Sequence, residues 1–175
     1  MECIRLLHEL GADVNMCDTT GFSPVCAAAQ AGQVESIRVL HELSADVNTC
    51  TTDGRSPVSS AAWQGQEECI RVLYELGADT NKCATEGRSP VWISTREDRA
   101  ECVRVLHALG ADVNKCDNDS MAPITAAAGP TANNTERVCL CMQLGADVRP
   151  LLHAASVGST VIEIVQEVNS FLEAT

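Results

Sequence analysis

The chain has 175 residues, of which 45% are hydrophobic but only 3% aromatic, so a core can form but must be built from aliphatic side chains and alanine. Twelve basic residues stand against 24 acidic ones, which gives a net charge of −12. This excess argues against binding to nucleic acid or to anionic membrane surfaces, because both need a basic footprint. Two interpretations of the charge stay open: a solvated acidic surface, or a basic protein partner.

The dominant pattern is a repeated segment, read most fully at Val72–Asn81. Near copies lie at Leu6–Asn15, Val39–Asn48 and Val105–Asn114, and a shortened copy lies at Leu140–Val148. The aspartate of the segment recurs in steps of 33 residues at Asp13, Asp46, Asp79 and Asp112, and then after 35 residues at Asp147. A fixed period of this kind predicts a repeat array, in which each unit packs mainly against its neighbours.

Each unit predicts a pair of helices. In the first full unit, Ser23 is placed to cap a helix over Val25–Ala31, with Pro24 at its first position, where the missing N–H costs nothing. Gly32 ends this helix, and a second helix is predicted over Val34–Leu43. The predicted units are a partial repeat at 1–17 without its first helix, full repeats at 18–50, 51–83 and 84–116, an irregular repeat at 117–149, and a cap-like helix pair at 150–175.

The later units depart from this pattern. Asp98 replaces the glycine that ends the first helix of the third unit, and we expect it to adopt the same left-handed conformation. In the fourth unit Gly129-Pro130 breaks the first helix early, and a two-residue insertion predicts an irregular loop near Ala132–Thr135 before a helix over Glu136–Leu144. The last predicted helices are Leu151–Val157 and Val161–Leu172.

These residues resemble the ankyrin repeat family, whose period is 33 residues and whose signature is Thr-Pro-Leu-His. The matching segments are Ser23-Pro24-Val25, Ser56-Pro57-Val58, Ser89-Pro90-Val91 and the Gly-Ala-Asp-Val-Asn sequence of Gly11–Asn15. The resemblance implies a single all-α, helix–turn–helix solenoid over residues 1–175, with short β-turn fingers, about four full repeats and partial repeats at both ends. It also implies a protein-binding module, usually without catalysis.

The signature histidine of the family is absent. Its position holds Cys26, Ser59, Trp92 and Thr125, so the hydrogen bond that it usually makes across the turn is missing or replaced. We expect Trp92 to be packed within the repeat.

Residues that vary between units on the fingers and first helices are the candidates for partner binding. They are Phe22, Gln30, Asp53, Arg55, Trp63, Gln64, Glu86, Arg88, Arg96, Glu97, Asp119 and Met121. Aromatic residues and arginine are the usual anchors of interfaces, which favours Phe22, Trp63 and the arginines. Trp63 has an alternative role, that of covering the neighbouring alanine-rich helix.

Ten cysteines are arranged on the repeat rather than in a disulfide pattern. Cys17, Cys50, Cys83 and Cys116 share one repeat position, and Cys3, Cys69 and Cys102 share another. Equivalent positions in stacked helical units lie roughly 8–10 Å apart, beyond the ~7 Å that a disulfide allows. Reduced thiols are therefore expected, although pairing between the two columns stays open. Without a signal-like start or an apolar run of ~20 residues, we expect a cytoplasmic or nuclear protein that is not secreted and not inserted in a membrane.

Other patterns favour structural roles. His8, His41 and His107 form a column beside arginines that precede glutamates by four residues, which indicates a solvated or half-buried helix face rather than a metal or pH-sensing site. Cys139 and Cys141 are expected to pack. The sequence has no phosphate loop, no dinucleotide fingerprint, no paired metal histidines and no nucleophile elbow. We therefore assign no catalytic residue, cofactor or metal.

The leading hypothesis is a non-catalytic scaffold that binds another protein through its concave finger and first-helix surface. One alternative is a substrate of asparagine hydroxylation, because Asn15, Asn48, Asn81 and Asn114 match the position that oxygenases modify in similar proteins. Another is a targeting module of a larger enzyme or effector. We expect a monomer unless the uncapped N-terminal unit self-associates.

Overall fold

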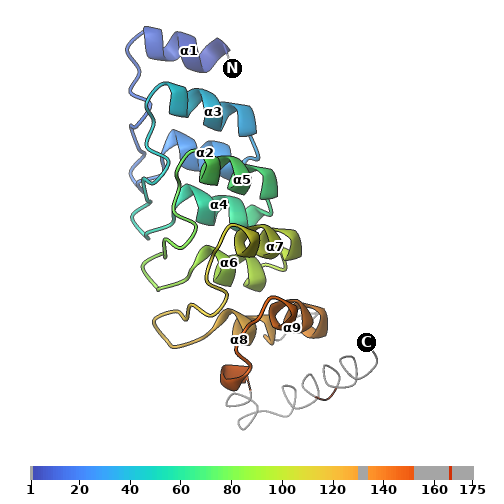
Figure 1. Cartoon of the computed structure of the whole chain (residues 1–175). Coiled ribbons are helices and arrows are strands. Elements are labelled where there is room, and N and C mark those ends of the chain that lie inside the picture. The colour runs from blue at the N-terminus through green and yellow to red at the C-terminus, as the bar shows by residue number, and fades with distance from the viewer. Residues whose placement is uncertain (1, 130–133, 152–165, 167–175) are drawn as a thin grey trace.

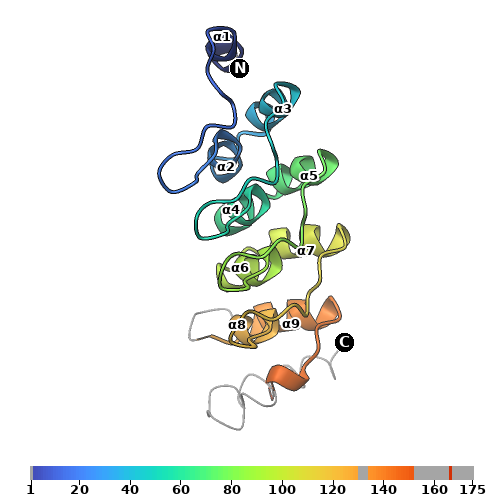
Figure 2. The ribbon, with the colours of Figure 1, turned by 90° about the vertical axis from the view of Figure 1, so that its left-hand side faces the viewer.

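The chain is described by a computed structural model that covers residues 2–129, 134–151 and 166. Its helices are α1 (Glu2–Glu9), α2 (Pro24–Gln30), α3 (Val34–Glu42), α4 (Pro57–Gln64), α5 (Glu67–Glu75), α6 (Pro90–Arg96), α7 (Ala100–Ala108), α8 (Pro123–Ala127) and α9 (Asn134–Gln143). The first helices α2, α4, α6 and α8 form one layer, and α1, α3, α5, α7 and α9 form the other (Figures 1 and 2). Over the described residues there is no strand, so the predicted all-α solenoid is confirmed.

Serine caps start the first helices, as the sequence predicts. The hydroxyl oxygens of Ser23, Ser56 and Ser89 accept hydrogen bonds from the backbone N–H three residues later, at 3.1–3.2 Å, and proline follows each serine. In the fourth unit Ala122 takes the capping position and offers no side-chain acceptor. Its helix α8 has only five residues, consistent with the loss of a cap and with the break predicted at Gly129.

One aliphatic core runs through the first three units, and a smaller separate cluster, which includes Ile124 and Val138, lies in the fourth. The largest members of the core, such as Ile37, Ile70, Leu73 and Leu106, are completely buried. On the facing first helices the buried residues are small, among them Ala29, Ala61 and Ala62. Small side chains let neighbouring helices approach closely, which explains how a chain with few aromatic residues still builds a continuous core. Within the described part of the chain, no helix is long and apolar enough to cross a bilayer.

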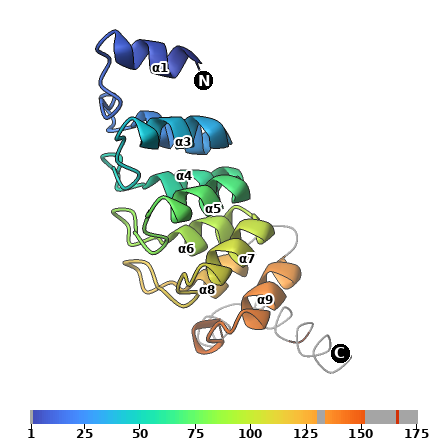
Figure 3. The same ribbon diagram turned by 45° about the horizontal axis from the view of Figure 1, so that its top comes forward.

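Asparagine side chains connect each unit to the next. The Oδ1 atoms of Asn15, Asn48, Asn81 and Asn114 accept hydrogen bonds from the backbone N–H of Asp46, Asp79, Asp112 and Asp147, at 2.7–2.9 Å. The Nδ2 atom of Asn48 also donates to the carbonyl of Gly77, at 3.1 Å. The fingers are residues 18–22, 51–55, 84–88 and 117–121, which project beside one another in Figure 3. They are linked by backbone hydrogen bonds, such as Thr85 N–H to Asp53 O at 3.0 Å.

The fourth unit differs from the prediction. Its second helix, α9, begins at Asn134 rather than Glu136 and ends at Gln143, so Thr135 is helical and not part of a loop. The first turn of α9 is held by Arg137, whose guanidinium donates to Asn134 Oδ1 at 3.0 Å and to the carbonyls of Thr95 and Arg96. The rest of the predicted insertion loop and nearly all of the cap-like helix pair lie outside the described residues.

The bounds of two other helices shift slightly from the prediction. α2 spans Pro24–Gln30 instead of Val25–Ala31, because the proline itself is the first helical residue, and α3 ends at Glu42. Asp98 has φ +56°, so it adopts the left-handed conformation that was expected of it. Ser44 (φ +69°) and Ser120 (φ +62°) do the same at positions where other units have glycine.

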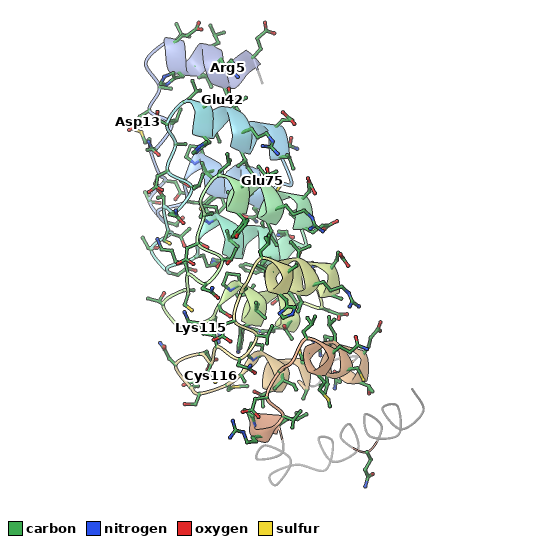
Figure 4. All side chains as sticks on the ribbon, viewed as in Figure 1. Arg5, Asp13, Glu42, Glu75, Lys115 and Cys116 are labelled. Atoms are coloured by element: carbon green, nitrogen blue, oxygen red, sulfur yellow. The ribbon has the colours of Figure 1, made fainter. Side chains whose placement is uncertain are left out.

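The arginine column, which is Arg5, Arg38, Arg71 and Arg104, makes ion pairs of two kinds: the first two arginines pair with the next unit, and the last two pair within their own helix. Arg5 pairs with Glu42, and Arg38 pairs with Glu75 at 3.1 Å, each on the next helix of the layer (Figure 4). The next step would join Arg71 to position 108, which is alanine, and Arg71 pairs instead with Glu68 at 3.6 Å on its own helix. All these side chains are more than 40% exposed, so the pairs contribute little to stability but mark the register of the stack.

Exchanging serine and glycine at one repeat position tests how much the left-handed backbone conformation costs a residue that has a side chain. Ser44→Gly should raise the free energy of unfolding by about 0.5–1 kcal/mol, because a left-handed serine costs about 1–2 kcal/mol and the greater freedom of glycine in the unfolded chain offsets part of the gain. Gly77→Ser, at the equivalent site with φ +89° and nothing within 4 Å of an added Cβ, should lower it by a similar amount. Urea unfolding curves measure both. Changes of the same sign would contradict the account.

Ala108→Glu should restore the missing step of the arginine column by giving Arg71 a partner on α7. The expected gain in the free energy of unfolding is about 0.2–0.5 kcal/mol, because the site is exposed, and it should disappear at high salt. Ala108→Gln is the matched control without charge. A gain for the glutamine variant equal to that for the glutamate variant would show that uncharged contacts of the longer side chain, and not the ion pair, are responsible, since helix propensity favours alanine.

Candidate functional site

A pocket of about 350 Å³ lies between the second and third fingers and the helices α4 and α6. We call it the finger pocket. The second unit contributes Asp53, Arg55 and Trp63, and the third contributes Ala84, Thr85, Glu86, Arg88, Trp92, Ile93, Arg96 and Glu97. Its volume is at the lower end of the range found for small-ligand sites. It is therefore large enough for one or two side chains of a binding partner.

The second-unit wall is an arginine stacked on an exposed tryptophan. The guanidinium carbon of Arg55 lies 4.5 Å from the centre of the Trp63 ring, and its Nε donates to Asp53 Oδ2 at 2.8 Å. Asp53 also accepts a hydrogen bond from the Thr51 hydroxyl, and this bond, with the nearby Arg55, holds the pKa of the Asp53 carboxyl below its usual value. Because Trp63 is 41% exposed, much of its surface remains available for contact.

The third-unit wall has a buried tryptophan under two arginines. Trp92 is 4% exposed, and the guanidinium groups of Arg88 and Arg96 lie 4.6 Å and 5.6 Å from the centre of its ring. Glu86 forms an ion pair with Arg88, and Glu97 lies 4.0 Å from Arg96. The packing predicted for Trp92 thus comes largely from side chains that themselves line the finger pocket.

Two hydrogen-bond donors in this wall are buried without an acceptor. They are the indole Nε1 of Trp92 and the Nε of Arg88, within the part of the chain that the structure describes. A buried donor without an acceptor is costly, at about 1–3 kcal/mol. A ligand oxygen that reached either group would recover some of that free energy, so this wall favours partners that carry a carbonyl or carboxylate oxygen.

The charges of the finger pocket balance locally. Three arginines and three carboxylates line it, although the whole chain carries a net charge of −12. The pocket therefore does not select an ion by net charge. Tryptophan faces that lie between paired charges suit an amphipathic segment of a partner protein. Such a segment would place an apolar or aromatic side chain on the tryptophan surface and polar atoms at the rim.

The structure brings together seven of the twelve predicted binding residues. Asp53, Arg55, Trp63, Glu86, Arg88, Arg96 and Glu97 line the finger pocket, whereas Phe22, Gln30, Gln64, Asp119 and Met121 do not. Phe22 is half-buried at the base of the first finger, and Met121 is 41% exposed on the fourth. Sequence reasoning left out Ala84, Trp92 and Ile93 as lining residues. The signal for Trp92 was its spacing of four residues from Arg96, which places both on one face of a helix.

The candidate modification sites have structural roles. Asn15 and Asn48 use both ends of their amides in bonds to the next unit. An enzyme that modified these side chains would first have to open the turn between two units.

The cysteines show no reactive environment in the core. All ten are free thiols. Burial raises the pKa of Cys102 to about 12 and the pKa values of Cys69 and Cys141 to about 11, so these thiols are neutral near pH 7. Among the described residues, no three His, Cys, Asp or Glu side chains gather in a way that could hold a metal ion.

Comparison with known protein families gives a match over two adjoining segments. A model described as ankyrin repeats in three copies matches residues 1–84, and one described as a single ankyrin repeat matches residues 86–118. A comparison with curated proteins found no match. Ankyrin repeats are generally protein–protein interaction modules and typically non-catalytic. With the helix pairs, the finger turns and the asparagine links in place, the chain belongs to the ankyrin repeat family.

Proposed function

We propose that the protein is a non-catalytic scaffold that binds a partner protein through the finger pocket. The observation that carries this proposal is the convergence of Trp63 and three arginines from two consecutive units around one cavity. Tryptophan and arginine are the residues most enriched at the energetic centres of protein interfaces.

The geometry favours a peptide segment rather than a large flat surface. The finger pocket is small, its walls come from both the second and the third unit, and its rim carries Asp53, Glu86 and Arg55 as partly exposed charges. A side chain that enters would lie against Trp63 and face the wall that contains the buried donors, which it could reach only if Arg88 or Arg96 moved. The rim charges would then select the flanking residues of the partner, since exposed charges contribute more to specificity and association rate than to affinity.

Both tryptophans of the chain line the finger pocket, which provides a direct measurement. Peptides selected on the full chain from a phage-displayed library of short random sequences should change the intrinsic tryptophan fluorescence on binding. For these peptides, Trp63→Ala combined with Arg88→Ala should weaken binding by about 30-fold or more, the effect of removing an interface anchor worth about 2 kcal/mol.

Tyr74→Ala is the matched control. Tyr74 is 46% exposed, similar to Trp63, but it lies on α5 outside the finger pocket. Its replacement should leave the affinity unchanged, and circular dichroism should show all variants folded. Equal affinity of the selected peptides for the wild type and the double variant would exclude the finger pocket as the binding surface.

A further inference from the structure

An apolar site lies at the α1 end of the stack and shares no lining residue with the finger pocket. It is a groove of about 420 Å³ between α1 and α2, and we call it the end groove. Its apolar lining consists of Ile4, Leu7, Ala12, Val14, Pro24, Ala27, Ala28, Ala31 and Leu40. Three of the large apolar side chains exposed in the described chain, Leu6, Leu7 and Leu10, lie on or just after α1. Clustered apolar exposure of this kind marks an interaction site.

The internal units show how the same residues behave when they are covered. Leu7 is 56% exposed, whereas its equivalents one, two and three repeats later, Leu40, Leu73 and Leu106, are exposed by 4% or less. Ala12 is likewise exposed, although its equivalent Ala45 is buried at 5%. The end groove therefore corresponds to a surface that is buried in each later unit of the stack.

A first helix closes this surface in the internal units. α2 packs against both α3 and α4, and α4 packs against both α5 and α6. In the described part of the chain no helix takes that place against α1 and α2 (Figure 2). The surface that α1 presents is almost the one that α2 already binds on α3, because Ile4–Glu9 reads Ile-Arg-Leu-Leu-His-Glu and Ile37–Glu42 reads Ile-Arg-Val-Leu-His-Glu.

The first helices that cover this surface in the internal units also indicate which kind of helix would fit the end groove. α2 and α4 each follow a serine cap, begin with Pro-Val and carry alanines in the middle, and the buried residues of α2 are Val25, Cys26, Ala28 and Ala29. Small side chains are required because the α2 side of the groove is itself formed by alanines, and a larger residue would hold the helices apart. The rim offers only His8, Asp13, Gln33 and Ser36 as polar groups, so shape and apolar contact dominate.

We propose that the end groove is a docking site for a short helix of a partner protein, one that begins with Ser-Pro and turns valine and alanine side chains toward the groove, in the way that α2 buries Val25, Ala28 and Ala29 within the stack. This site is independent of the finger pocket. It continues the interface that already joins each unit to the next, so the partner helix adds to the stack as a first helix would.

A peptide that copies residues 18–33 with Cys26→Ser is the direct probe, because it contains the finger, the cap and the α2 sequence. Titrated into the isotope-labelled full chain, it should produce saturable NMR shifts centred on Leu7, Ala12 and Ala27. Ala27→Glu places a charge in the groove at an already exposed position and should weaken binding by about tenfold or more. Ala108→Glu, the same substitution on α7 outside the groove, should leave binding unchanged.

Three results would overturn the proposal. One is the absence of saturable shifts in the wild type, and another is equal binding by the Ala27→Glu variant or by a peptide of the same composition in scrambled order. The third is a dimer of the protein alone in analytical ultracentrifugation that dissociates in the Ala27→Glu variant and is not displaced by the peptide, which would make a second copy the occupant.

Discussion

The arrangement depends on the hydrogen bonds that join one turn to the next. The amide of Asn48 accepts from Asp79 N–H and donates to Gly77 O, so one side chain fixes where the next unit begins. The acceptor bond recurs at Asn15, Asn81 and Asn114. Each unit of such a stack contacts mainly its neighbours. The hydrogen bonds between adjacent turns therefore set the position of each unit, without contacts between units that are far apart in the chain. The ion pairs of Arg5 and Arg38 follow the same register but are too exposed to enforce it.

The finger pocket follows from that registration. Trp63 and Arg55 belong to the second unit, while Trp92 and Arg88 belong to the third, and they form one cavity because the two units are held at a fixed offset. The residues that recur in each unit thus form the scaffold, and the residues that differ between units line the finger pocket. The end groove has the opposite origin, since it is made by residues that recur from unit to unit, Leu7 and Pro24 among them, where no first helix of the described chain covers them.

Most of the fold could be predicted from the sequence because its determinants are local and repeated. A serine before proline starts a helix, a glycine ends it, and the period of 33 places the units in order. The bounds of α9 were missed because its first turn is held by Arg137, which bonds to carbonyls of the preceding unit about forty residues earlier. The contact of Arg38 with Glu75 on another helix could not be predicted for a similar reason, because spacing within one helix carries no information on that contact. In the candidate site, Arg55 and Trp63 could be found from variation between units, whereas the place of Trp92 beneath Arg88 and Arg96 depends on side-chain packing.

The central claim is that asparagine links between turns hold the units in register. Urea unfolding of Asn48→Ala tests it most directly, with Gln30→Ala, an exposed position on α2, as the control. Loss of two hydrogen bonds should lower the free energy of unfolding by about 2 kcal/mol, at about 1 kcal/mol for each bond. Hydrogen exchange should show weaker protection at Asp79 and in the turn around it. A change no larger than that of the control, with protection at Asp79 intact, would contradict the account.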